Sequence, residues 1–280
     1  LRRRGVGGRQ HDEIDVAEGK ARRRQALLVL VGLHHVPERA RGARLVVANA
    51  GVDQDFVMLR LDQVRVRFHD QVVLRGVNMD VPASQTTVLI GRNGAGKTTT
   101  LRALMGVLPL VGGRILLDDL DISGVPSHDR ARLGIGYAPE DRRLIPEFSV
   151  EDNLLLPAVA LRFAAVERKR RLDEIFALLP EVAGLRARSG GVLSGGQGKM
   201  VALGRALMAG TRYVLLDEPF QGLAPALALS YADTLVRLRK SRPELGLLIT
   251  ESTPRLLDKI VDNSLLIERG EISRLARAAA

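Results

Sequence analysis

The stretch TTVLIGRNGAGKTTTLRALMGVL, residues 86–108, carries three successive structural signals. The apolar and β-branched run at 86–90 predicts a short buried strand. The glycine-rich segment GRNGAGKT follows it directly at 91–98, and apolar residues then recur at helical spacing across Leu101–Leu108. A strand, a glycine loop and a helix in this order predict an α/β fold in which ligands meet the end of a parallel strand.

The glycine loop matches the pattern G-x-x-x-x-G-K-T, which binds phosphate for a physical reason. Glycines let successive backbone N–H groups curve around an anion, and the following helix directs its positive end at the same point. We expect Lys97 to reach the β and γ phosphates of a nucleotide. We expect the hydroxyl of Thr98 to bind Mg²⁺.

A second apolar run, YVLLDEP at 213–219, places an acidic pair where a buried strand ends. Continuous apolar strands are typical of parallel sheets that are covered on both faces. Asp217 is the candidate for the Mg²⁺ shell, and Glu218 is the candidate that orients or deprotonates the attacking water. Taken alone, the pair also fits the start of a solvated loop; the phosphate loop favours the catalytic interpretation.

A second glycine turn, LSGGQ at 193–197, precedes the acidic strand. A helix follows it, with Met200, Leu203 and Leu207 on one face, so its N-terminus is also directed at an anion. A helix start capped by serine is the structural alternative. The order phosphate loop, LSGGQ, LLDEP resembles that of the ATP-binding-cassette (ABC) ATPases, and the resemblance extends from Leu59 to Ser273.

The resemblance implies an α/β fold of the P-loop NTPase class, with a mainly parallel core sheet. It also implies an N-terminal antiparallel β subdomain and a helical insertion subdomain at about 145–192. Two cassettes sit head to tail in this family, so that each signature turn closes on the ATP of the other copy. We therefore expect ATP and Mg²⁺ as cofactors and a homodimer or heterodimer as the active form.

Site residues are carried over onto the matching positions of this chain. Catalytic roles are expected for Lys97, Glu218 and Ser252, and Mg²⁺ ligation is expected for Thr98, Asp217 and Glu140. Nucleotide contacts are expected from Phe68, Gly91, Arg92, Asn93, Gly94, Ala95, Gly96, Lys97, Thr98, Thr99, Ser194, Gly195, Gly196 and Gln197.

Several of these positions depart from the family pattern or admit another interpretation. Phe68 is expected to stack on adenine, although a lone Phe on a strand also fits the core. Glu140 stands where most members have Gln, and Ser252 stands where most have a His that braces the γ-phosphate. Lys199 and its neighbours replace a more polar run, and we expect Lys199 to add charge near the helix start.

Residues 1–57 differ in character from the rest of the chain. They carry the basic clusters LRRR and ARRR and show no persistent period, and the first methionine of the chain is Met58. We expect this segment to be a disordered or non-native extension and the cassette to occupy 58–280. No apolar run approaches the roughly 20 residues that a transmembrane helix needs.

Composition limits the remaining function classes. The chain has no cysteine, which excludes disulfides and thiol catalysis. Its net charge of +10 leaves open a cassette that acts on nucleic acid or ribosomes, yet the arginines are scattered and no nucleic acid is expected. A non-hydrolytic regulatory subunit is a second alternative, weakly suggested by Glu140 and Ser252.

Within the family, the segments APEDRRLIPEF and DEPFQGLAP resemble the ATPase subunits of branched-chain amino-acid importers and their urea or amide relatives. That resemblance implies transmembrane permeases as partners and a periplasmic solute-binding protein as an indirect one. It implies a peripheral location on the cytoplasmic face of the inner membrane.

Overall fold

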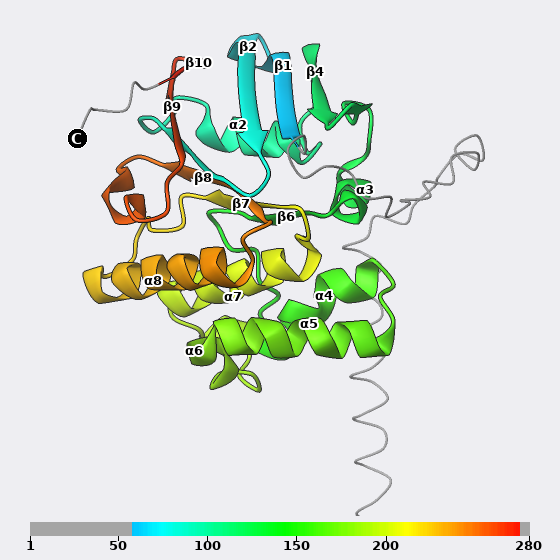
Figure 1. Ribbon diagram of the computed structural model, residues 1–280, viewed down its shortest axis with the longest axis vertical. Helices are drawn as coiled ribbons and strands as arrows, with labels where there is room; N and C mark the ends of the chain where they lie inside the picture. Colours follow the sequence, from blue (N-terminus) through cyan, green and yellow to red (C-terminus); the bar gives the residue numbers. More distant parts are fainter. Residues whose placement is uncertain (1–57, 275–280) are drawn as a thin grey trace, which may run out of the picture. The chain divides into compact units, whose positions relative to one another are not determined.

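The computed structural model describes residues 58–274, which form two sheets and a layer of helices (Figure 1). The segment 1–57, expected to be an extension, lies outside the described residues. Among residues 58–274, no helix combines the length and apolar character that a bilayer span requires.

The larger sheet has six strands and is parallel except at one edge. Its spatial order is β10 (Glu271–Arg274), β9 (Asn263–Glu268), β3 (Thr86–Ile90), β8 (Gly246–Glu251), β7 (Tyr213–Asp217) and β6 (Ile135–Ala138). The edge strand β10 pairs antiparallel with β9. The strands β3, β7 and β8 are adjacent, so their carboxyl ends bring the phosphate loop and the acidic pair together.

The smaller sheet is antiparallel throughout and contains the start of the described chain. Its spatial order is β2 (Gln71–Pro82), β1 (Met58–Phe68), β4 (Gly112–Leu117) and β5 (Leu120–Asp121). Alternating burial along β1, with Leu59, Leu61, Val64 and Val66 inside, gives this sheet one apolar face.

Seven α-helices complete the described chain. They are α2 (Lys97–Leu104), α3 (Ser127–Arg130), α4 (Val150–Ala160), α5 (Ala165–Leu178), α6 (Pro180–Ala183), α7 (Gly195–Ala209) and α8 (Pro225–Ser241). Short 3₁₀ turns lie at η3 (Ala131–Leu133), η4 (Gly190–Val192) and η5 (Pro254–Leu257).

The two faces of the parallel sheet belong to two separate apolar cores. Along β7, Tyr213 and Leu215 join the core that includes α2 and the antiparallel sheet, whereas Val214 and Leu216 join the core that includes α7 and α8. The helix after the phosphate loop and the helix after the SGG turn therefore cover opposite faces of the sheet, as Figure 1 shows. A strand buried on both faces needs apolar residues at every position, which explains the run YVLL.

The chain between β6 and β7 contains α4, α5 and α6, which pack with α7 on one apolar core. The amphipathic helix α5 buries Leu172 and Ile175, while its charged residues face outward and form ion pairs such as Lys169–Asp173. The P-loop NTPase fold with a parallel core, an antiparallel sheet and helices is confirmed. The helices α4, α5 and α6 lie within the range expected for the insertion, about 145–192, and the bounds of that subdomain remain a prediction.

A buried arginine joins the antiparallel sheet region to the end of α2. Arg130 is 1% exposed, and its guanidinium donates to the carbonyl oxygens of Ala103 and Leu104 and to three carbonyls in the segment 122–125. Gly106 has φ +63°, and a Cβ there would lie 2.7 Å from the Arg130 side chain. Burial lowers the pKa of Arg130 to about 10, so it remains charged at neutral pH.

Candidate functional site

The phosphate loop begins where β3 ends, and its glycines are required by the backbone. Gly94 and Gly96 have φ of +80° and +115°, a region that residues with a Cβ rarely adopt. A Cβ on Gly91 would lie 2.5 Å from the carbonyl oxygen of Ile267 on β9. The loop is therefore tightly packed on the sheet, and α2 begins immediately after it at Lys97.

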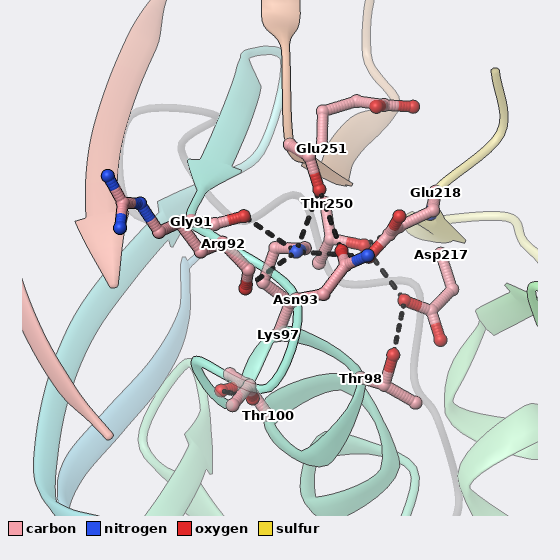
Figure 2. Close-up of polar contacts among 12 residues, drawn as sticks. Gly91, Arg92, Asn93, Lys97, Thr98, Thr100, Asp217, Glu218, Thr250 and Glu251 are labelled. Atoms are coloured by element: carbon pink, nitrogen blue, oxygen red, sulfur yellow. Dashed lines mark hydrogen bonds and ion pairs between the residues drawn. The ribbon is translucent and has the colours of Figure 1, made fainter. Parts of the chain in front are cut away.

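Lys97 is held inside this loop and faces the acidic strand (Figure 2). Its side chain is 3% exposed. The ammonium donates to the carbonyl oxygens of Gly91 at 2.7 Å and Arg92 at 3.2 Å, and to the hydroxyl of Ser252 at 3.1 Å. It also forms an ion pair with Glu218, with an Nζ–Oε1 distance of 3.0 Å. A phosphate that binds in the loop must therefore share or replace these partners.

Asp217 at the end of β7 lies beside Thr98 of α2. Thr98 donates to Asp217 Oδ1 over 3.1 Å, and Thr250 of β8 donates to the same oxygen over 2.8 Å. Tyr137 of β6 donates to Asp217 Oδ2 over 3.1 Å. Burial raises the pKa of Asp217 above its ordinary value, and the three hydroxyl donors oppose that rise. Sequence patterns missed Thr250 and Tyr137, since neither follows from a motif.

The oxygen atoms around Thr98 and Asp217 fit the ligand preference of Mg²⁺. Magnesium usually takes one or two protein oxygens together with phosphate and water. Within residues 58–274, no group of three or more acidic or histidine side chains forms a metal cage. Glu140 lies exposed in the turn after β6, and its role as a metal ligand remains a prediction.

Glu218 sits at the turn that follows β7, with an unusual backbone. Its φ is +45°, in the left-handed region, which costs a residue with a Cβ about 1 kcal/mol. Its N–H donates to both the carbonyl and the hydroxyl oxygen of Thr250, each over 3.1 Å. Its side chain is 8% exposed and aims at Lys97. The fold thus directs a buried carboxylate at the phosphate loop.

A second buried carboxylate, Glu251, lies at the end of β8. It is 5% exposed, and its Oε1 accepts the N–H of Phe220, which follows the acidic pair, over 3.1 Å. Burial raises the pKa of Glu251 to about 7, and the neighbouring Glu218 acts in the same direction. Sequence analysis did not select Glu251, although it directly precedes the expected γ-phosphate residue Ser252.

Ser252 lies at the mouth of the phosphate loop. Its hydroxyl accepts from Lys97 and donates to Asn93 Oδ1 over 3.1 Å. Ser252 therefore lies beside the phosphate loop, and its contact with a γ-phosphate remains a prediction. Phe68 ends β1 with 42% of its surface exposed, so the core alternative is excluded, whereas its contact with adenine remains a prediction.

The SGG turn begins α7 with a reciprocal cap. The hydroxyl of Ser194 accepts the N–H of Gln197 at 3.3 Å, and Gln197 Oε1 accepts the N–H of Ser194 at 3.0 Å. Gly195 is exposed, while Gly196 is buried against α8. A Cβ on Gly196 would lie 2.7 Å from the side chain of Leu227. The turn is therefore a capped helix start, as the structural alternative predicted. Ser194 and Gly195 still lie exposed at the surface.

Lys199 lies in the N-terminal half of α7, where charge was expected, but the sequence did not predict its burial. Its side chain is 9% exposed and donates to the backbone carbonyl of Glu218. The reason is helical geometry, because position 199 is on the face of α7 that packs toward the sheet, beside the buried Met200.

Comparison with known proteins agrees with this geometry. Residues 74–221 match the family model described as ABC transporter. The lipopolysaccharide export system ATP-binding protein LptB of Acidithiobacillus ferridurans is 34% identical, over 77% of this chain and 88% of its own. A probable branched-chain amino acid transport ATP-binding protein, LivF of Archaeoglobus fulgidus, is 31% identical, over 77% and 90%.

The solved structures agree at the level of the whole cassette. The ADP conformation of MJ1267, an ATP-binding cassette of an ABC transporter, superposes with a TM-score of 0.66 at 26% identity. The match covers 78% of this chain and 89% of that one. The chain belongs to the ABC transporter family and is an ATP-hydrolysing cassette, the ATPase subunit of a transporter.

Proposed function

We propose that this chain hydrolyses ATP in a site shared between two cassettes and thereby powers a membrane importer of the branched-chain amino-acid type. Two neighbouring contacts support ATP hydrolysis: the ion pair between Lys97 and Glu218, and the hydrogen bond from Thr98 to Asp217. Both pairs lie at the carboxyl ends of the parallel strands β3 and β7, which flank β8, and such sheets bind ligands at these ends.

In this proposal Lys97 leaves Glu218 for the β and γ phosphates, and Glu218 becomes free to orient and deprotonate the attacking water. Ser252 donates a hydrogen bond to the γ-phosphate, which gives weaker bracing than a charged residue would. When bound, Mg²⁺ neutralises charge on the phosphates, and Thr98 and Asp217 would hold it. Phe68 supplies the ring against which adenine stacks.

The placement of the two glycine turns supports a shared site. The helices α2 and α7 cover opposite faces of the sheet, and the SGG turn is presented outward at the start of α7. A second cassette that packs head to tail would bring its own Ser194 and Gly195 to the phosphates held by Lys97. The members of this family act as dimers with transmembrane permeases.

The protein contains no cysteine, so a cross-link can test this arrangement directly. Asn93→Cys and Ser194→Cys in one chain should form an intermolecular disulfide when ATP is present and hydrolysis is blocked. Each single variant supplies the matched control. A disulfide that forms within one chain, or ATP-independent linkage of monomers, would contradict the shared site.

The direction and solute of transport are proposed from the relatives and from two sequence segments. The LivF relative, at 31% identity, and the APEDRRL and GLAP segments favour amino-acid import. A second candidate is lipid export, because LptB of Acidithiobacillus ferridurans is 34% identical. In the import case, permeases would dock on the helical part at about 145–192, on the cytoplasmic side of the inner membrane, and a periplasmic protein would deliver the solute.

Reconstitution with transmembrane permease subunits from the same organism would separate the two candidates. For an importer, leucine, urea or an amide with its binding protein should raise the ATPase rate. Stimulation by a lipopolysaccharide substrate alone would instead favour export and refute the importer proposal. A cassette whose ATPase responds to duplex DNA would contradict both.

A further inference from the structure

The N-terminal half of α7 carries a buried cation that no step of the proposed hydrolysis uses. Lys199 donates its ammonium to the carbonyl oxygen of Glu218. Among the described residues, Glu251, Glu140 and Glu218 supply the negative field around it, and Arg142 opposes them. Burying an ammonium costs free energy unless it is hydrogen-bonded or paired. The hydrogen bond to Glu218 therefore constrains where Lys199 and α7 can lie.

The backbone N–H and the backbone carbonyl of Glu218 are both hydrogen-bonded to neighbouring elements. Thr250 of β8 accepts its N–H, and Lys199 of α7 donates to its carbonyl. Because Glu218 has φ of +45°, its backbone is in a conformation that the chain does not favour by itself. These three hydrogen bonds therefore hold the backbone from which the carboxylate extends toward Lys97.

The same helix is attached at its far side to the segment after β6. Arg205 donates to the carbonyl oxygen of Arg143 over 2.6 Å and also to that of Arg142. Gly198 makes room for the Arg142 side chain, since a Cβ there would lie 2.9 Å from Arg142 Cδ. A displacement of α7 would therefore move Glu218 through its hydrogen bond with Lys199. It would also move the turn after β6 through the hydrogen bonds of Arg205.

We propose that Lys199 is a positioning residue that ties α7 to the backbone of Glu218, so that closure of one ATP site is transmitted to the carboxylate of the other. This step rests on the shared site proposed above. The SGG turn of each cassette contacts the partner's nucleotide, whereas Lys199 of the same helix contacts the cassette's own Glu218. One rigid helix of 15 residues thus joins two active sites.

The absence of cysteine permits a chemical test of this role. In Lys199→Cys the new thiol is unique, and alkylation with 2-bromoethylamine in the unfolded state, followed by refolding, rebuilds an ammonium at the original length. Alkylation with 1-iodopropane supplies a neutral group of the same length. Lys169→Cys, at the exposed Lys169 on α5, receives both treatments as the matched control.

The expected result separates charge from packing. The cysteine and propyl forms should lose kcat by roughly 10- to 100-fold, because a small misplacement of a catalytic group costs that much, while the Kd for ATP changes less than about twofold. Their Hill coefficient for ATP should fall from above about 1 toward about 1. The aminoethyl form should recover both kcat and cooperativity.

Three outcomes would overturn the inference: full activity of the unmodified cysteine form, equal recovery by the propyl group, or a wild-type Hill coefficient of about 1. Failure of the shared site itself is recognised separately. In that case the wild-type protein gives no intermolecular cross-link between positions 93 and 194, whatever the behaviour of the Lys199 variants.

Discussion

The ion pair between Lys97 and Glu218 makes a quantitative prediction for Glu218→Gln. In the structure the two side chains are 3.0 Å apart and almost fully buried, so the ammonium that should bind phosphate is already occupied by a carboxylate. ATP has to displace this partner. Replacing the carboxylate by an amide keeps the shape of the side chain but weakens the competitor, and it removes a negative charge that faces the γ-phosphate.

The magnitude follows from the charge–charge attraction that the substitution removes, because the ammonium keeps its charge and can still donate a hydrogen bond to the amide. At a separation of 3.0 Å this attraction is about 1.4 kcal/mol even with the screening of bulk water. That energy corresponds to a Kd for ATP that is roughly 10-fold lower. Loss of repulsion toward the γ-phosphate acts in the same direction, so this figure is a lower bound. The loss of a general base should reduce kcat by about 10²- to 10⁴-fold.

Displacement of a fluorescent ATP analogue measures the affinity, and phosphate release measures turnover. Glu174→Gln, at an exposed position on α5, is the matched control and should change neither. ADP lacks the γ-phosphate and should gain less affinity than ATP. A Kd for ATP that is unchanged or higher in Glu218→Gln would refute the competition argument. Phosphate release at the native rate would refute the role of Glu218 in hydrolysis.

Three further substitutions test other parts of the structure. Lys97→Ala should raise the Kd for ATP by roughly 10- to 100-fold, as titration with a fluorescent nucleotide would reveal, because charge-assisted bonds to phosphate are lost. Arg130→Met should lower the free energy of unfolding by about 3–5 kcal/mol and Tm by about 10 °C, whereas Arg132→Met at the surface should not; equal calorimetric melts would contradict this. The fold raises the pKa of Glu251 from 4.5 to about 7, so between these pH values the native state retains a proton that the unfolded chain releases. The free energy of unfolding should therefore fall by about 3 kcal/mol as pH rises from 4.5 to 7. Glu251→Gln should remove that part of the pH dependence, and identical pH–Tm curves for both proteins would sink the assignment.

Local motifs allowed much of this fold to be predicted. The strand, loop and helix at 86–108 are determined by neighbouring residues, because glycine conformations and helical spacing act over a few positions. The fully apolar run YVLL likewise predicted a strand covered on both faces, and β7 has that position. The candidate residues Lys97, Thr98, Asp217 and Glu218 consequently meet in one place.

The contacts that tune the site could not be predicted in the same way. Thr250 and Tyr137 reach Asp217 only because β8 and β6 flank β7, and strand order is a tertiary property. Burial of Lys199 depends on which face of α7 meets the sheet, and a helical period predicts a face without naming its neighbour. Sequence analysis therefore expected charge near the start of the helix but did not predict that Lys199 is buried and hydrogen-bonded to Glu218.

The charge balance of the site predicts that a nucleotide binds more tightly together with a divalent cation than alone. Around the acidic strand the described residues bury three carboxylates, Asp217, Glu218 and Glu251, against two ammonium groups, Lys97 and Lys199. The fold already relieves the excess, because burial raises the pKa values of Asp217 and Glu251 and so favours their neutral forms. A triphosphate would bring further negative charge beside Glu218. Lys97 can pair with that charge or with Glu218. A cation held by Thr98 and Asp217 would allow the phosphate, Asp217 and Glu218 to stay ionised together.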